Sequence, residues 1–113
     1  MAAAFAEGQT TVRDAEELRH KESDRIAKIC QELRVLGVDL QEAPDGFTIN
    51  GGKPISGGEV HAHGDHRLAM ALTVGGLAAQ GPVTVEGVEI IAESFPGFMT
   101  TLQSLGAVLR HER

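Results

Sequence analysis

The uncharged stretch from Leu68 to Ala79 limits the possible folds more than any other feature of the sequence. It is too short to cross a bilayer, which takes about 20 apolar residues. Apolar side chains occur on every side of a helix drawn through it, so we predict a helix buried in a core, from His66 to about Gln80. Gly75 and Gly76 weaken such a helix and allow close packing against a neighbour. Gly81-Pro82 ends it.

The rest of the chain alternates between strand and helix patterns. A second helix is indicated by apolar residues at helical spacing between Ile26 and Leu36, followed by Gly37. The other predicted elements are a helix tail at 2–6, strands at 10–13, 59–63, 83–85 and 108–109, a hairpin at 38–41 and 47–49, and a helix from Ser94 to Leu105. The order β-α-β-β-α-β-α-β predicts an α+β (α/β) fold within one unit, residues 1–113.

Charge and cysteine content exclude several classes of partner and location. The net charge is −6 and no run of Lys or Arg stands out, which argues against nucleic acid and anionic membranes. Small anions need only a few converging cations. The N-terminus lacks the basic region of a signal peptide, and Cys30 is the only cysteine, so we expect a cytoplasmic protein. We assign Cys30 to the core and residues 111–113 to the surface.

Two charged clusters precede the two main predicted helices: RHKESDR at 19–25, and Asp65-His66-Arg67. One interpretation of the second cluster is a metal site, with His61, His63 and Asp65 as ligands. Arg67, and Lys21 if the clusters meet, would repel a dication, so we expect no metal.

The other interpretation is an anion site. Helix N-termini attract phosphate and carboxylate groups, and arginine grips either with two hydrogen bonds. In that case Asp65 can orient Arg67, and Glu22 is free for proton transfer. Charged residues at a helix start are also common as solvated caps. Spacing alone leaves these two readings equally open.

Three segments closely resemble the C-terminal part of the 5-enolpyruvylshikimate-3-phosphate synthases: LRHKESDRI (18–26), GDHRLAMALTVGGLAAQGPVTVEG (64–87) and ESFPGFMTTLQSLGA (93–107). The sequences of these segments are most similar to those of the bacterial, glyphosate-tolerant branch. The resemblance implies βαβαββ units with buried helices, arranged in two domains. Family members are several times longer, so residues 1–113 are expected to be a C-terminal fragment without the N-terminal domain.

The resemblance also implies an activity. Such enzymes transfer the enolpyruvyl group of phosphoenolpyruvate to the 5-hydroxyl of shikimate 3-phosphate, through a tetrahedral ketal and with no cofactor. By motif, Lys21 matches the lysine that contacts shikimate 3-phosphate, and Glu22 the proton-transfer glutamate. Arg25 and Arg67 match the arginines that hold phosphoenolpyruvate, with Asp65-His66 in support. The fragment is expected to be inactive alone, because the partner aspartate and the N-terminal domain lie outside it.

Departures from the family pattern leave alternatives open. His20 stands where an apolar residue is usual, and Ala92-Glu93 where many members carry a lysine. The alternatives are a fragment of the related UDP-N-acetylglucosamine enolpyruvyl transferase, and an anion-binding or structural module without chemistry.

Overall fold

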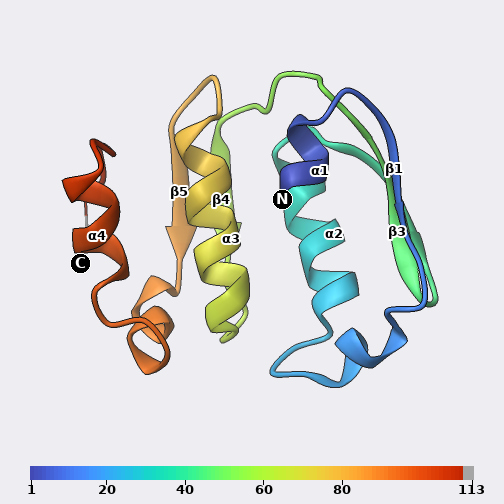
Figure 1. The fold of residues 1–113 in the computed structure, drawn as a ribbon, viewed down its shortest axis with the longest axis horizontal. Helices are drawn as coiled ribbons and strands as arrows, with labels where there is room; N and C mark the ends of the chain where they lie inside the picture. The colour runs from blue at the N-terminus through green and yellow to red at the C-terminus, as the bar shows by residue number, and fades with distance from the viewer. Residues whose placement is uncertain (111–113) are drawn as a thin grey trace.

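The computed structural model describes residues 1–110, which form two small sheets on either side of a pair of helices (Figure 1). The elements in chain order are α1 (Ala2–Phe5), β1 (Gly8–Val12), η1 (Glu16–His20), α2 (Arg25–Val35), β2 (Asp39–Ala43), β3 (Gly46–Gly51), β4 (Gly58–His61), α3 (His66–Leu77), β5 (Val83–Glu86), η2 (Val88–Glu93) and α4 (Phe98–Ser104), where η denotes a 3₁₀ helix.

The first sheet is antiparallel, in the order β1-β3-β2, and packs on α2. The predicted hairpin is confirmed as β2 and β3, with Leu40 opposite Ile49. These two side chains, with Cys30 and Leu33 of α2, are buried together. Gly46 is needed at the start of β3, because a Cβ there would lie 1.8 Å from the carbonyl oxygen of Val12.

The second sheet pairs β4 with β5 in parallel, and α3 makes the connection between them. A βαβ unit of this kind buries its helix against the strands. Leu68 and Leu72 of α3 share a core with Val60 of β4 and Leu36 at the end of α2. This core holds α2 and α3 side by side, with their N-terminal ends at the same end of the fold (Figure 1). The predicted mixed α+β class is thus confirmed.

The prediction that α3 is buried on all sides is wrong for this chain. Val74 and Leu77 are 47% and 42% exposed, because the elements that pack on α3, chiefly η2 and β5, cover only part of the helix surface. None of the described helices is long and apolar enough to cross a membrane.

The C-terminal region differs most from expectation. A 3₁₀ helix occupies residues 88–93, so the last helix begins at Phe98 instead of Ser94. The predicted strand at 108–109 is absent: residues 107–110 have no regular secondary structure, and Val108 is 91% exposed. The 3₁₀ helix Glu16–His20 was not predicted either. The assignment of residues 111–113 to the surface lies outside the described residues.

Candidate functional site

The start of α2 is defined by Asp24. Its Oδ1 accepts the Ala27 N–H at 3.0 Å, which is the N-cap contact, and this bond together with Arg19 lowers the pKa of Asp24. Arg19 also donates to the carbonyl oxygens of Pro44 and Ala43, both at 2.7 Å. Arg19 therefore ties the charged segment 19–25 to the β2–β3 turn, and its guanidinium is already occupied by protein groups.

The start of α3 is defined by Asp65 in the same way. Its Oδ1 accepts the Arg67 N–H at 3.0 Å and, more weakly, the Leu68 N–H at 3.5 Å. The Asp65 side chain is fully buried. The chain reaches it through two consecutive left-handed residues, His63 (φ 53°) and Gly64 (φ 68°), which turn the end of β4 into the helix.

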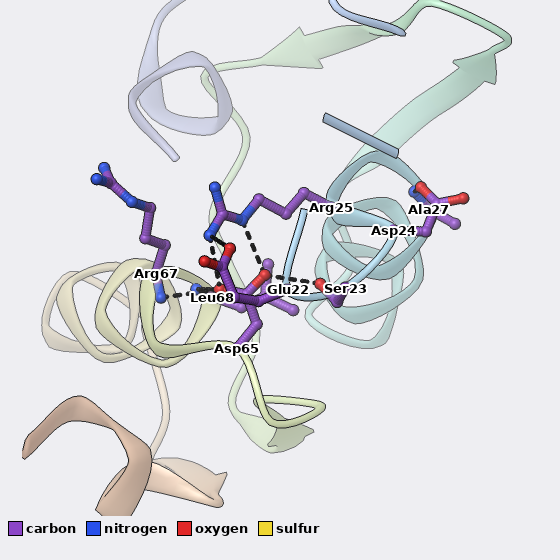
Figure 2. Close-up of polar contacts among 8 residues, drawn as sticks. All are labelled: Glu22, Ser23, Asp24, Arg25, Ala27, Asp65, Arg67 and Leu68. Atoms are coloured by element: carbon purple, nitrogen blue, oxygen red, sulfur yellow. Dashed lines mark hydrogen bonds and ion pairs between the residues drawn. The ribbon is translucent and has the colours of Figure 1, made fainter. Parts of the chain in front are cut away.

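The two helix starts meet through a buried ion pair (Figure 2). Arg25 Nε donates to Asp65 Oδ2 at 2.8 Å, and Nη2 donates to Oδ1 at 3.3 Å. Ser23 Oγ donates to the same Oδ2 at 2.7 Å. Burial opposes ionisation of Asp65, but the hydrogen bonds from Arg25, Ser23 and the Arg67 N–H outweigh it and lower its pKa. The bond to Asp65 in turn raises the pKa of Arg25.

The other predicted site residues surround this pair. Glu22 forms an ion pair with Arg25 Nη2 and remains half exposed. Arg67 is exposed, and Figure 2 draws its guanidinium with no contact to the other labelled side chains. Lys21 is also exposed, and His66 is partly exposed in the first turn of α3. Glu22, Arg25 and Asp65 are thus in contact, while Lys21, His66 and the Arg67 side chain only flank them.

Two details differ from the sequence-based interpretation. Asp65 was expected to orient Arg67, but its carboxylate holds the guanidinium of Arg25 and takes only the backbone N–H of Arg67. Glu22 was expected to be free, but it pairs with Arg25. The reason is geometric: an N-cap carboxylate faces its own helix's N–H groups and whatever lies in front of that helix, here α2.

Chemically, the arrangement is suited to holding an anion. Asp65 and Glu22 occupy Nε and Nη2 of Arg25, and within residues 1–110 its Nη1 has no protein acceptor. The guanidinium of Arg67 likewise has none in this part of the chain. Two donors that match carboxylate and phosphate oxygens therefore stand at neighbouring helix N-termini.

The three residues considered as metal ligands face different partners. His61 Nδ1 lies 2.9 Å from Glu86 Oε2, and His63 Nε2 lies 2.8 Å from Glu32 Oε2. Asp65 is occupied by Arg25. The structure therefore does not bring this set together.

A different group has metal-ligand geometry. Among the described residues, Glu59, His61 and Glu86 alone place three such ligand atoms within 4.8 Å of one another. All three side chains are exposed. A hydrogen bond with Glu86 raises the pKa of Glu59, as expected for two carboxyl groups in contact. The group lies on β4 and β5, apart from the contacts around Asp65.

Comparison with known proteins identifies the family. The family model described as EPSP synthase (3-phosphoshikimate 1-carboxyvinyltransferase) matches residues 1–102. This chain belongs to the EPSP synthase family. The family named by this match is the shikimate enzyme, not the UDP-N-acetylglucosamine enzyme considered above.

Similar curated proteins carry the name of the same family. The 3-phosphoshikimate 1-carboxyvinyltransferase of Synechococcus sp. (strain JA-3-3Ab) is 55% identical over 105 residues, which are 93% of this chain and 24% of that protein. The enzyme of the same name from Nitrosococcus oceani is 47% identical over 111 residues, 98% of this chain and 25% of its own length. The chain therefore spans about a quarter of the length of these relatives.

The fold of this chain also matches solved structures of the family. A 2.37 Å structure of EPSP synthase from Acinetobacter baumannii superposes with a TM-score of 0.94 at 40% identity, covering 99% of this chain and 27% of that one. The predicted enolpyruvyl transferase-like fold is confirmed.

Two side chains that shape the site, Ser23 and Glu32, were not among the predicted site residues, and His63 was considered only as a metal ligand and not as the partner of Glu32. Ser23 lies inside the LRHKESDRI segment, in which only the charged residues were predicted to belong to the site. Glu32 carried a visible signal, because it falls between Ile29 and Leu36 on the apolar face of α2. A charge in that position indicates a buried acid with a partner.

Proposed function

We propose that these residues form one wall of the active site of a 3-phosphoshikimate 1-carboxyvinyltransferase, as a C-terminal part of that cytoplasmic enzyme. The observation that carries the proposal is Arg25, held on one edge by a buried aspartate while Nη1 stays without a protein partner within residues 1–110. The full enzyme would transfer the enolpyruvyl group of phosphoenolpyruvate to the 5-hydroxyl of shikimate 3-phosphate and release phosphate.

Arg25 and Arg67 would bind the carboxylate and phosphate of phosphoenolpyruvate. The Arg67 guanidinium can give two parallel hydrogen bonds to such a group, and Arg25 can donate to it through Nη1. The helix N-termini add favourable electrostatics. Since Asp65 and Ser23 fix the orientation of Arg25 before any ligand arrives, little reorganisation is needed at the moment of reaction.

The chemistry would proceed by addition and then elimination. The acceptor hydroxyl loses its proton as its oxygen bonds to the central carbon of phosphoenolpyruvate, and the electrons of the C=C double bond take up a proton at the methylene carbon, giving the tetrahedral ketal. Elimination then removes a proton from the new methyl group and expels phosphate. Glu22 is the residue for the proton at this carbon, since it is half exposed beside Arg25. Lys21 would bind the phosphate of the acceptor, and His66 would support the Asp65–Arg67 turn.

A chimera tests the activity. Replacing the matching quarter of the Synechococcus enzyme with this chain should preserve phosphate release from phosphoenolpyruvate and shikimate 3-phosphate. The 113 residues alone should release none, because they supply only one wall of the site. Turnover by the chain alone, or an inactive chimera that folds, would refute the proposal.

A binding experiment tests the site itself. Titration of the chain with phosphoenolpyruvate should show weaker binding in Arg25→Ala and Arg67→Ala, by roughly tenfold each, since a charged hydrogen bond contributes about 1.5 kcal/mol or more. Arg34→Ala is the matched control, because Arg34 lies in the last turn of α2, at the opposite end from Arg25. Equal affinity in all three variants would contradict the two-arginine site.

A further inference from the structure

Glu32 is a charged residue inside the core. It lies in the C-terminal half of α2 with 1% exposure, and α2 packs on the first sheet and on β4. An isolated carboxylate in such a place would be strongly destabilising, so its contacts account for its presence.

Both carboxylate oxygens of Glu32 are directed at the segment that runs from the last residue of β4 to α3. Oε1 accepts the backbone N–H of His61 at 2.9 Å. Oε2 accepts a hydrogen bond from Nε2 of His63 at 2.8 Å. One side chain of α2 thus holds the segment by its backbone and by a ring.

The segment that Glu32 holds is conformationally demanding. His63 has φ 53°, in the left-handed region, which is unfavourable for a residue with a Cβ. Gly64 follows at φ 68°. The contact with Glu32 favours this turn over alternatives, and the turn delivers Asp65 to its buried position.

Glu32 and Arg25 form two attachment points on one helix. They stand about two helical turns apart, so they lie on the same face of α2, roughly 10 Å from each other along its axis. Arg25 binds Asp65, and Glu32 binds His61 and His63, on the same short segment. A single attachment would let the start of α3 pivot against α2. Two attachments at this separation fix both its distance and its angle.

We infer that Glu32, acting through His63, is a positioning residue that sets where the start of α3, with Arg67, stands relative to Arg25. It touches no substrate, and its effect is on the angle between two anion-binding arginines. The inference rests on the proposed function, because it assumes that Arg25 and Arg67 serve one anionic ligand. The ligand class is a small anion with carboxylate or phosphate oxygens.

The test compares His63→Ala with His63→Gln. Both replacements have a Cβ and need the same left-handed backbone at position 63, so the comparison shows the effect of the side chain beyond Cβ. The glutamine amide N–H can still donate to Glu32, whereas alanine cannot. Ile49→Val is the stability control, since it removes a buried methyl group from the first sheet and touches neither contact.

The first readout is phosphoenolpyruvate affinity of the chain. His63→Ala should bind about tenfold more weakly, the affinity carried by roughly one charged hydrogen bond from a displaced arginine, while His63→Gln stays within about twofold of the parent. Ile49→Val should lower the Tm and leave the affinity unchanged. If His63→Ala loses no more affinity than Ile49→Val, the positioning role is refuted. If Arg25→Ala and Arg67→Ala also bind phosphoenolpyruvate with the parent's affinity, the result refutes the proposed function itself and not only the positioning role.

The second readout needs no ligand. In a nitrogen-15 NMR spectrum, the Arg25 Nε–H should exchange slowly with solvent, because it is bonded to the buried Asp65. His63→Ala should speed this exchange, and His63→Gln and Ile49→Val should not. Unchanged exchange in His63→Ala would overturn the inference whatever the affinity shows.

Discussion

The contact between Asp65 and Arg25 allows a stability prediction that separates the ion pair from the helix cap. Asp65→Asn keeps an oxygen that can accept the Arg67 N–H, and asparagine is a good N-cap residue. The second oxygen becomes an N–H₂ group facing Arg25 Nε, so donor meets donor. The substitution therefore removes the ion pair and leaves the cap.

The size of the stability loss in Asp65→Asn follows from the burial of the ion pair. Removing one partner of a buried ion pair costs about 3–5 kcal/mol, because the other charge is left uncompensated. Arg25 keeps its pair with Glu22 and is 14% exposed, so we expect the lower end, about 3 kcal/mol. For a chain of this size that corresponds to a fall in Tm of roughly 12 °C. Asp65→Ala should lose about 1 kcal/mol more, because it also removes the cap.

Urea unfolding followed by far-UV circular dichroism measures both losses, and the absence of tryptophan rules out the usual fluorescence probe. Asp39→Asn is the control, since Asp39 is exposed and its nearest cation, Lys53, is 3.7 Å away; it should stay within about 0.5 kcal/mol. The double variant with Arg25→Met should lose less than the sum of its parts. Additive losses would refute the reasoning.

Three further predictions concern ionisation and the β2–β3 turn. The pKa of Asp65 is lowered in the folded chain, so its carboxylate stabilises the fold above the ordinary carboxyl pKa of about 4, and this stabilisation is lost as the pH falls through the folded pKa. In urea titrations at acid pH, the difference in unfolding free energy between the parent and Asp65→Asn should therefore disappear. Burial raises the pKa of Cys30 to about 11, so the unfolding free energy should fall as the pH rises from the unfolded thiol pKa of about 8.5 toward 11. Ellman's reagent at pH 8 should label Cys30 only as fast as the chain opens and exposes the thiol. Arg19→Ala should speed amide hydrogen exchange around the turn at Ala43–Gly46, whereas Arg13→Ala should not, which NMR can follow; equal exchange in the two variants would show that Arg19 does not hold the turn.

Local patterns predicted the elements whose causes are local. The apolar spacing from Ile26 to Leu36 and the glycine after it gave the span of α2 to within a residue at either end. The turn sequence Pro44-Asp45-Gly46 lies between the two predicted hairpin strands, and β2 and β3 pair across it. Both signals operate within a few residues, so one sequence is enough to read them.

Contacts made at long range could not be predicted in this way. A strand was expected at 10–13, but nothing in it specifies β3 as its partner, with Thr10 opposite Ile49. The exposure of Val74 and Leu77 has a related cause. An apolar pattern reports every surface that a helix packs against, and residues 1–110 supply only part of such a surface.

The candidate site shows where reasoning from neighbours in the sequence misleads. Asp65 was paired with Arg67, two positions away, although its carboxylate binds Arg25, 40 positions away. A cap residue has little freedom to meet the side chain of the next turn, since its own helix takes one oxygen for backbone N–H groups. The other oxygen faces out from the helix end, toward a neighbouring element. A buried Asp before an Arg at a helix start is therefore better evidence for a cation on an adjacent helix than for an ion pair within its own helix. The Glu32–His63 contact follows the same logic, because a carboxylate inside an apolar face has to find its partners on whatever packs against that face.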